Sequence, residues 1–175
     1  MQLKLFIGLG NPGREYVHTY HNVGHSFIDF LNAKRCALRD LLKSPVYMNE
    51  SGRFVVQELK REGVKPEELL TIHDDSDLEL GEFKLSFGRG SAGHKGVQSI
   101  IDALKTKNFW RLRIGVRNAG GLVRRSPNEA LLRQRLRRAK AGDFVLKKIA
   151  KSDAAVLERV FSQALAKISE FLTEK

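Results

Sequence analysis

The stretch LKLFIGLGNPGREYVHTYHNVG, Leu3 to Gly24, decides the fold and carries the first candidate site. Its apolar start, Leu3 to Ile7, predicts a buried strand, which the glycines and the proline of residues 8–13 end in a tight turn. Asn11 lies in this turn, at the carboxyl end of a strand, where open α/β sheets bind their ligands. His21 follows just before a helical pattern. The stretch therefore predicts a reaction site, although a glycine turn or a helix-capping histidine taken alone is more often structural.

Length and composition predict one globular domain over residues 1–175, with 42% hydrophobic residues. No apolar run is long enough to span a membrane, and the first residues do not form a secretion signal. The single cysteine, Cys36, excludes an internal disulfide and offers no metal cluster. We therefore expect a cytoplasmic protein without a membrane partner.

The charge balance predicts a polyanionic partner. Lys and Arg number 31 against 20 Asp and Glu, which gives a net charge of +11. Such an excess attracts polyanions and accelerates their encounter, and nucleic acid is the usual one. The alternative is that the chain is simply basic, as some small proteins are.

Strand and helix patterns alternate along the chain without repeats, which predicts a layered α/β fold. We expect helices over 22–35, from Ser51 to Gly63, over 97–104 and over 153–172. After the first strand we expect further strands over 41–47, 69–72, 81–87 and 111–116. The last helix has one apolar face and covers the sheet.

Residues 117–142 interrupt this alternation with eight Lys and Arg and a single Glu. A solvated insertion is one interpretation. The other, which we favour, is an arm that contacts phosphates and becomes ordered on RNA.

The polar residues at the predicted strand ends indicate water-activating chemistry. Asp74 directly follows the strand 69–72, and Asn11, Asn49 and His94 lie in loops that converge on the same crevice of an α/β sheet. A carboxylate that binds one imidazole nitrogen fixes the tautomer and stabilises the cation that forms on proton uptake. Because no Ser or Cys has a nucleophile context, a His–Asp pair activating water is the simplest chemistry. The glycine-rich loop 88–96 before a helix adds a predicted phosphate cradle.

The segment GLGNPGREYVHTYHNVGHSFID closely resembles the signature of bacterial-type peptidyl-tRNA hydrolases, a strand followed by G-L-x-N-P-G and Y-x-x-T-R-H-N-x-G. Met48-Asn49, HDDSDL at 73–78, GSAGHKGV at 90–97 and FVL at 144–146 follow in the family's order. The resemblance implies a single-domain three-layer α/β sandwich whose mixed, mostly parallel twisted sheet carries helices on both faces. It also implies a monomer that hydrolyses the ester between a peptide and the 3′ ribose of tRNA, without metal or cofactor.

The resemblance assigns a role to each matching position. His21 is the general base on water and Asp74 supports it, while Asn11 reads the blocked amino group of the substrate. Asn49 holds the peptide backbone or the tRNA terminus and positions the attacked carbonyl. Residues assigned to substrate and tRNA binding are Tyr16, Tyr47, Met48, Asn49, His94 and Lys95. His73 and His94 are expected to shape the site rather than act as bases.

The sequence departs from the family pattern at several places. Tyr20 replaces the arginine before His21, and Lys95 replaces the asparagine of an H-N-G element, where it offers a cation for phosphate. The connection before Met48 is short, which predicts a smaller or rebuilt sheet edge, and relatives usually have a shorter loop at 117–142. A non-enzymatic RNA-binding relative is therefore the alternative interpretation. A dinucleotide-dependent enzyme is a weaker alternative, since the third glycine of the dinucleotide-binding motif and the acidic residue at the end of a second strand are missing.

Overall fold

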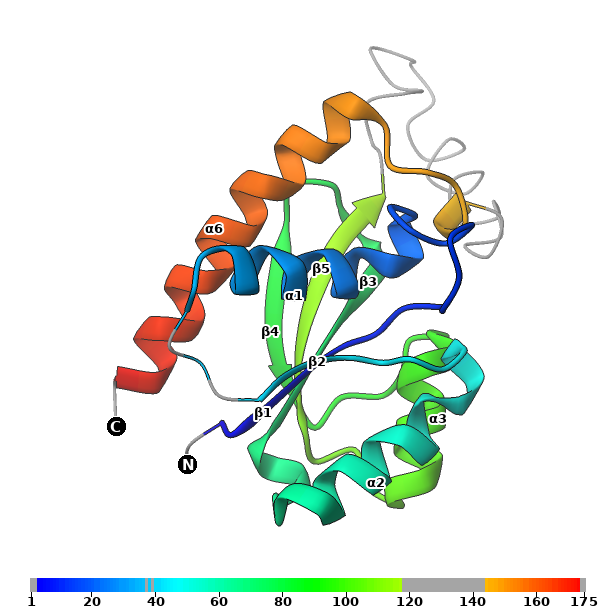
Figure 1. Ribbon diagram of the computed structural model, residues 1–175, viewed down its shortest axis with the longest axis vertical. Coiled ribbons are helices and arrows are strands. Elements are labelled where there is room, and N and C mark those ends of the chain that lie inside the picture. The colour runs from blue at the N-terminus through cyan, green and yellow to red at the C-terminus, as the bar shows by residue number, and fades with distance from the viewer. Residues whose placement is uncertain (1–2, 37, 39, 118–143, 174–175) are drawn as a thin grey trace, which may run out of the picture.

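The structure, a computed structural model, describes residues 3–36, 38, 40–117 and 144–173. A sheet lies between two pairs of helices, α1 with α6 and α2 with α3 (Figure 1), so the predicted three-layer α/β fold is confirmed. The elements are β1 (Leu5–Gly8), the 3-10 turn η1 (Tyr20–Asn22), α1 (Val23–Ala33), β2 (Leu41–Lys43), η2 (Met48–Glu50), α2 (Ser51–Glu62), η3 (Pro66–Glu68), β3 (Leu69–Glu79), β4 (Phe83–Phe87), α3 (Lys95–Leu104), β5 (Trp110–Arg117) and α6 (Lys151–Thr173). Apart from Arg117, the basic stretch expected over 117–142 lies outside the described residues.

The sheet has five strands in the order β2-β1-β3-β5-β4. β1 pairs in parallel with β2 and β3, and β3 pairs in parallel with β5, whereas β4 runs antiparallel to β5. The prediction of a mixed, mostly parallel sheet is therefore confirmed. Gly8, the last residue of β1, lies opposite Ile72 of β3. The loop that follows β1 therefore starts beside the residues that follow Ile72 in β3.

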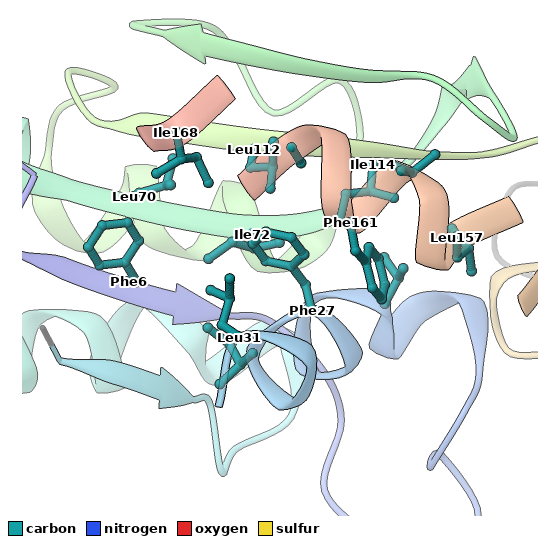
Figure 2. Close-up of a cluster of buried hydrophobic side chains, with 14 of the residues drawn as sticks. Phe6, Phe27, Leu31, Leu70, Ile72, Leu112, Ile114, Leu157, Phe161 and Ile168 are labelled. Carbon is teal, nitrogen blue, oxygen red and sulfur yellow. The ribbon is translucent and has the colours of Figure 1, made fainter. Parts of the chain in front are cut away.

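Each face of the sheet carries its own hydrophobic core, because successive side chains of a strand point to opposite faces. In β1, Phe6 faces α1 and α6, while Leu5 and Ile7 face α2 and α3. Figure 2 shows the first core, in which Phe27 of α1 and Phe161 of α6 meet above the sheet. β1 and the first half of β3 are buried throughout, as expected for inner strands of a mostly parallel sheet that carries helices on both faces.

Gly24, in the first turn of α1, allows the helix to lie directly on the sheet. A Cβ there would lie 2.3 Å from the carbonyl oxygen of Ile72 and 2.6 Å from that of Leu9. Both contacts are with backbone, which cannot move aside. This close approach places η1, and with it His21, over the carboxyl end of β1 and the middle of β3.

Two predicted strand boundaries are wrong. The strand expected over 41–47 ends at Lys43, because Pro45 has no N–H for the ladder. The strand expected over 69–72 continues to Glu79, because pairing with β5 persists through Asp74 and Asp75 and resumes after a register shift. Asp74 therefore lies inside β3 rather than after its end.

The remaining boundaries agree within a few residues. α2 starts at Ser51 and ends before Gly63, which takes the left-handed conformation at φ +62. β4 begins at Phe83 rather than at Gly81, because Gly81 has φ +103 and belongs to the turn.

Candidate active site

The predicted site residues gather around one cavity of about 420 Å³ at the carboxyl end of β1. Its lining includes Asn11, His21, Tyr47, Met48, Asn49, Asp74, His94 and Lys95. Tyr16 lies beside the cavity, where its ring packs edge-on against Tyr47 at 6.3 Å. The loops after β1 and before α3, the turns η1 and η2, and the middle of β3 thus supply one site.

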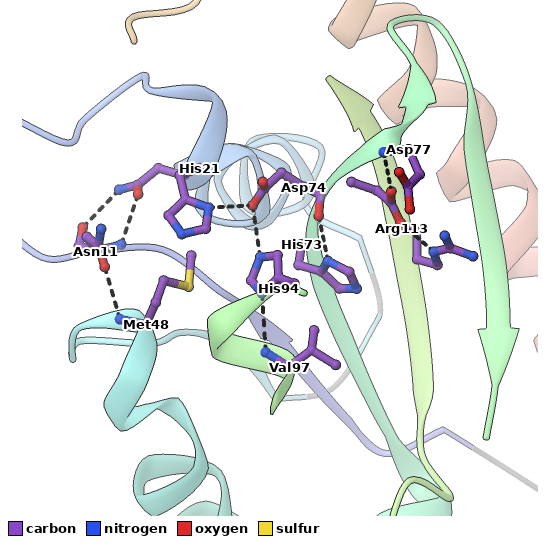
Figure 3. Close-up of polar contacts among 11 residues, drawn as sticks. Asn11, His21, Met48, His73, Asp74, Asp77, His94, Val97 and Arg113 are labelled. Carbon is purple, nitrogen blue, oxygen red and sulfur yellow. Dashed lines mark hydrogen bonds and ion pairs between the residues drawn. The ribbon is translucent and has the colours of Figure 1, made fainter. Parts of the chain in front are cut away.

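His21 has a defined tautomer. Its neighbours Tyr20 and Asn22 are buried, while its own ring reaches the cavity. Nδ1 of His21 lies 2.8 Å from Oδ1 of Asp74 (Figure 3). An ionised carboxylate only accepts hydrogen bonds, so Nδ1 carries the hydrogen and Nε2 keeps a free lone pair. Nε2 makes no hydrogen bond within the described residues, and it is therefore able to take a proton from a bound water.

Asp74 stays ionised although it is buried. Burial on its own would raise the pKa of this carboxyl group. The favourable electrostatic interaction with the His94 ring and the hydrogen bonds that His21 and His94 donate outweigh burial and hold the pKa far below its ordinary value. The site thus contains a permanent buried negative charge that faces two imidazole rings.

His94 connects this charge to the start of α3. Its Nδ1 accepts a hydrogen bond from the backbone N–H of Val97 at 3.2 Å, which caps the helix. The other ring nitrogen, Nε2, must then carry a hydrogen, and it donates to Oδ1 of Asp74 at 3.0 Å. Both nitrogens of His94 are therefore occupied, so His94 orients Asp74 and is not available as a base.

His73 is the third imidazole of the cluster, with its ring 4.6 Å from that of His94. Nδ1 of His73 donates to the carbonyl oxygen of Asp74 at 2.6 Å, and Nε2 is buried without a partner among the described residues. Burial, reinforced by the electrostatic influence of the neighbouring His94 ring, keeps the pKa of His73 well below its ordinary value. His73 therefore stays neutral, and of the three imidazoles in this cluster His21 is the one with an accessible unpaired nitrogen in the cavity.

The side chains of His21, Asp74 and His94 also have the spacing of a metal site, since one ligand atom from each lies within 4.8 Å of the others. A histidine binds a metal through an unprotonated nitrogen. Nε2 of His94 is protonated as long as Nδ1 caps α3 at Val97. The donor set therefore fits a hydrogen-bonded proton network better than a metal site.

Asn11 is held rigidly by three hydrogen bonds. Its backbone N–H donates to Oδ1 of Asn22, whose Nδ2 donates back to the carbonyl of Asn11, both at 2.9 Å. Oδ1 of Asn11 accepts the backbone N–H of Met48 at 3.0 Å. The amide nitrogen of Asn11 has no partner in the described part of the chain. Asn11 therefore presents a hydrogen-bond donor, and not an acceptor, to the cavity.

Comparison with known proteins is decisive at this point. The sequence model of the protein family described as peptidyl-tRNA hydrolase matches residues 5–175 of this chain. The chain belongs to the peptidyl-tRNA hydrolase family.

Relatives and solved structures agree with this assignment. The peptidyl-tRNA hydrolase of Mycobacterium ulcerans is 42% identical over 132 residues, which cover 64% of this chain and 69% of that protein. That of Nitrosomonas europaea is 39% identical over 140 residues, covering 69% and 72%. A crystal structure of the Acinetobacter baumannii peptidyl-tRNA hydrolase has a TM-score of 0.76 at 29% identity and covers 98% of this chain and 89% of that one. No described helix has both the length and the hydropathy that a membrane span requires.

The structure places the residues that depart from the peptidyl-tRNA hydrolase signature on opposite sides of His21. Lys95 is exposed and lines the cavity at the first position of α3. Tyr20 is buried and points away from the cavity toward α6, where its hydroxyl meets Asp153.

Three residues of the site were missed by sequence reasoning. Asn22 fixes the backbone of Asn11, and its place directly after His21 in the signature was an available signal. Val145 and Leu146 also line the cavity. Their resemblance to the family's FVL element was noticed, but nothing local in the sequence indicated contact with the site. Met48 contributes mainly its backbone N–H, because its side chain is packed into the core on the α2–α3 face.

Proposed function

We propose that this peptidyl-tRNA hydrolase cleaves the ester between a peptide, or an N-blocked amino acid, and the 3′ ribose of tRNA, with His21 as the general base. The observation that carries the assignment of the base is the hydrogen bond from Nδ1 of His21 to Asp74. It leaves Nε2 free in the cavity, while both nitrogens of His94 are occupied and His73 is buried. One of the three imidazoles is therefore equipped to accept a proton.

In the proposed mechanism a water molecule donates a hydrogen bond to Nε2 of His21 and attacks the ester carbonyl carbon. His21 takes the proton, and the Asp74 carboxylate stabilises the resulting imidazolium. Amide and backbone N–H donors of the site stabilise the oxyanion of the tetrahedral intermediate. Its collapse expels the 3′ oxygen of the ribose, to which His21 returns the proton. The products are a peptide acid and a tRNA with a free 3′ hydroxyl.

Asn11 gives a physical reason for selecting blocked substrates. Because its Oδ1 is occupied by Met48, the side chain offers only the N–H donors of its amide nitrogen. An acylated amino group places a carbonyl oxygen nearby that accepts such a hydrogen bond. The ammonium of a free aminoacyl-tRNA has donors only, and it would meet a donor. In this proposal, Asn11 selects substrates that place a hydrogen-bond acceptor, and not a donor, next to its amide N–H.

Groups at the rim of the cavity suit the tRNA terminus. Tyr47 is half exposed, and Asn49 and Lys95 are exposed beside it. An aromatic face stacks on a base, and a lysine ammonium binds phosphate. The net charge of +11 favours the approach of the tRNA. The proposed enzyme acts in the cytoplasm as a monomer and needs no cofactor.

The test compares release of an N-acetylated amino acid from tRNA by the wild type, His21→Asn and His18→Asn. His18 is an exposed histidine three positions earlier, and it serves as the matched control. We expect release by the wild type and by His18→Asn, and tRNA binding without release by His21→Asn. If the wild type binds tRNA and releases nothing, the protein is an RNA-binding relative instead.

A further inference from the structure

Tyr20 connects the turn that carries His21 to the last helix. Its ring is only 4% exposed, and its hydroxyl donates a hydrogen bond of 2.5 Å to Oδ2 of Asp153 in α6, which is equally buried. We infer that Tyr20 and Asp153 form a positioning pair that holds the Val145–Leu146 wall of the active site in place for the substrate. The inference rests on the proposed hydrolase function.

The bond between Tyr20 and Asp153 has the character of a strong, charge-assisted hydrogen bond. Lengths of about 2.5 to 2.7 Å are typical when a hydroxyl donates to a carboxylate. Burial, and then the hydrogen bond to Asp153, raise the pKa of Tyr20 to about 12, so its hydroxyl remains a donor. Asp153 lies in the first turn of α6, where the helix dipole favours a negative charge, and Ser152 donates to its other oxygen at 3.0 Å.

The same tyrosine ring supports the wall directly. Phe144 stacks on Tyr20 with ring centroids 4.6 Å apart and an interplanar angle of 24°. The next two residues, Val145 and Leu146, line the cavity, and Leu146 is 49% exposed. The wall is thus bounded on one side by the Tyr20–Phe144 stack and on the other by the start of α6.

Backbone contacts align this segment with the residues before His21. The N–H of Tyr20 donates to the carbonyl of Lys147 at 3.2 Å, and the N–H of Ile149 donates to that of His18 at 2.8 Å. Nζ of Lys148 donates to the carbonyls of Glu15 and Val17. These contacts set the register of residues 15–20 against residues 147–149. The buried Tyr20–Asp153 bond then joins both segments to α6.

The Tyr20–Asp153 bond does not act on the proton network itself. His21 is fixed by Asp74, and Asp74 is fixed by His94, through bonds that involve neither member of the pair. Loss of the pair is therefore expected to affect substrate binding against the wall more than proton transfer. In kinetic terms KM changes and kcat is largely preserved.

The experiment uses Tyr20→Phe, which keeps the stacked ring and removes the donor, and Tyr20→Arg, which supplies a new donor to the same carboxylate. For Tyr20→Phe we expect KM for N-acetyl-aminoacyl-tRNA to rise about tenfold, because the substrate must then order a wall that a hydrogen bond to a charged group no longer holds, and that bond sets the scale of the cost. We expect kcat to stay within about twofold. Amide hydrogen exchange over 145–149 should become faster. Tyr20→Arg should return KM and exchange to near wild-type values. Asp153→Asn, which keeps an acceptor but loses the charge, should lie between these limits.

Three outcomes decide the inference. An unchanged KM in Tyr20→Phe with only a lower melting temperature overturns it, because the pair would then serve packing alone. An equal rise of KM in the phenylalanine and arginine variants also overturns it, because the donor would not matter. If the wild type hydrolyses nothing, while exchange over 145–149 rises in Tyr20→Phe and recovers in Tyr20→Arg, the proposed function fails and the positioning pair stands.

Discussion

Replacing Asp74 with asparagine tests the proton network at its centre. The substitution keeps the shape of the side chain and removes the charge that faces His21 and His94. Both rings donate to the same oxygen, Oδ1, and a neutral amide oxygen in its place accepts these two hydrogen bonds more weakly than a carboxylate oxygen does. We therefore expect Asp74→Asn to impair proton uptake by His21 while leaving the cavity intact.

The size of the effect follows from the contact distance. When Nε2 takes a proton, His21 becomes a cation whose Nδ1 lies 2.8 Å from Oδ1 of Asp74. Because each charge is spread over its whole group, the two charge centres lie farther apart than these atoms, and two unit charges about 4 Å apart attract by about 4 kcal/mol at an effective dielectric constant of about 20. Because each 1.36 kcal/mol of barrier corresponds to about a factor of ten in rate, kcat should fall about a thousandfold.

The assay is single-turnover release of N-acetylated amino acid from tRNA, which isolates the chemical step from product release. Asp29→Asn is the matched control, because it makes the same chemical change at an exposed carboxylate that pairs with Lys43. We expect the control to match the wild type. A loss smaller than tenfold in Asp74→Asn would refute the reasoning that this carboxylate stabilises the imidazolium.

The difference in unfolding free energy between the wild type and Asp74→Asn should depend on pH. The pKa of Asp74 is lower in the folded chain than its ordinary value of about 3.9. Its carboxylate therefore stabilises the fold above about pH 4, and this contribution declines as the pH falls further. In urea unfolding, the stability advantage of the wild type over Asp74→Asn should narrow below pH 4; an advantage that widens there would contradict the assignment.

Three further predictions concern the scaffold and the substrate contacts. Gly24→Ala forces a methyl group against sheet carbonyls and should lower the unfolding free energy by at least about 2 kcal/mol in denaturant titration, whereas Gly90→Ala, with nothing within 4 Å, should change it little; equal effects would contradict the close approach. Asn11→Asp keeps the acceptor oxygen but removes the amide donor, and should raise KM for N-blocked substrate about tenfold; an unchanged KM would argue against donor recognition. Lys95→Ala should reduce the slope of log K against log salt for tRNA binding by about 0.7 to 0.9, and an unchanged slope would exclude a phosphate contact.

Local patterns were sufficient for the frame of the molecule. The apolar start of β1, the glycine at the end of α2 and the amphipathic α6 each report burial or backbone conformation within a few residues. The candidate residues Asn11, His21 and Asp74 were recognised because the signature is long and places them in order. Their convergence in one cavity follows from the parallel pairing of β1 with β3, which places the loop after Gly8 beside Asp74 in the middle of β3.

Features that depend on distant partners were not predictable in this way. The polar run HDDSD resembles a loop, but pairing with β5 holds it as the second half of β3. His94 binds Asp74 with one ring nitrogen and Val97 with the other, which requires β3 and the first turn of α3 to lie next to each other. The role of Tyr20 requires a partner 133 positions away, and no local property of either residue indicates it.

The separation of 133 positions between Tyr20 and Asp153 has a consequence for folding during synthesis, because the two residues leave the ribosome at very different times. The proton network of His21, Asp74 and His94 is complete once residue 94 has been made, whereas the Val145–Leu146 wall and its anchor Asp153 emerge near the end. Chains leave the ribosome N-terminus first and begin to fold in that order. A translation product truncated before residue 144 thus contains its base, its acid and several substrate contacts but lacks the Val145–Leu146 wall, so the active-site cavity is complete only when synthesis of the chain is nearly finished.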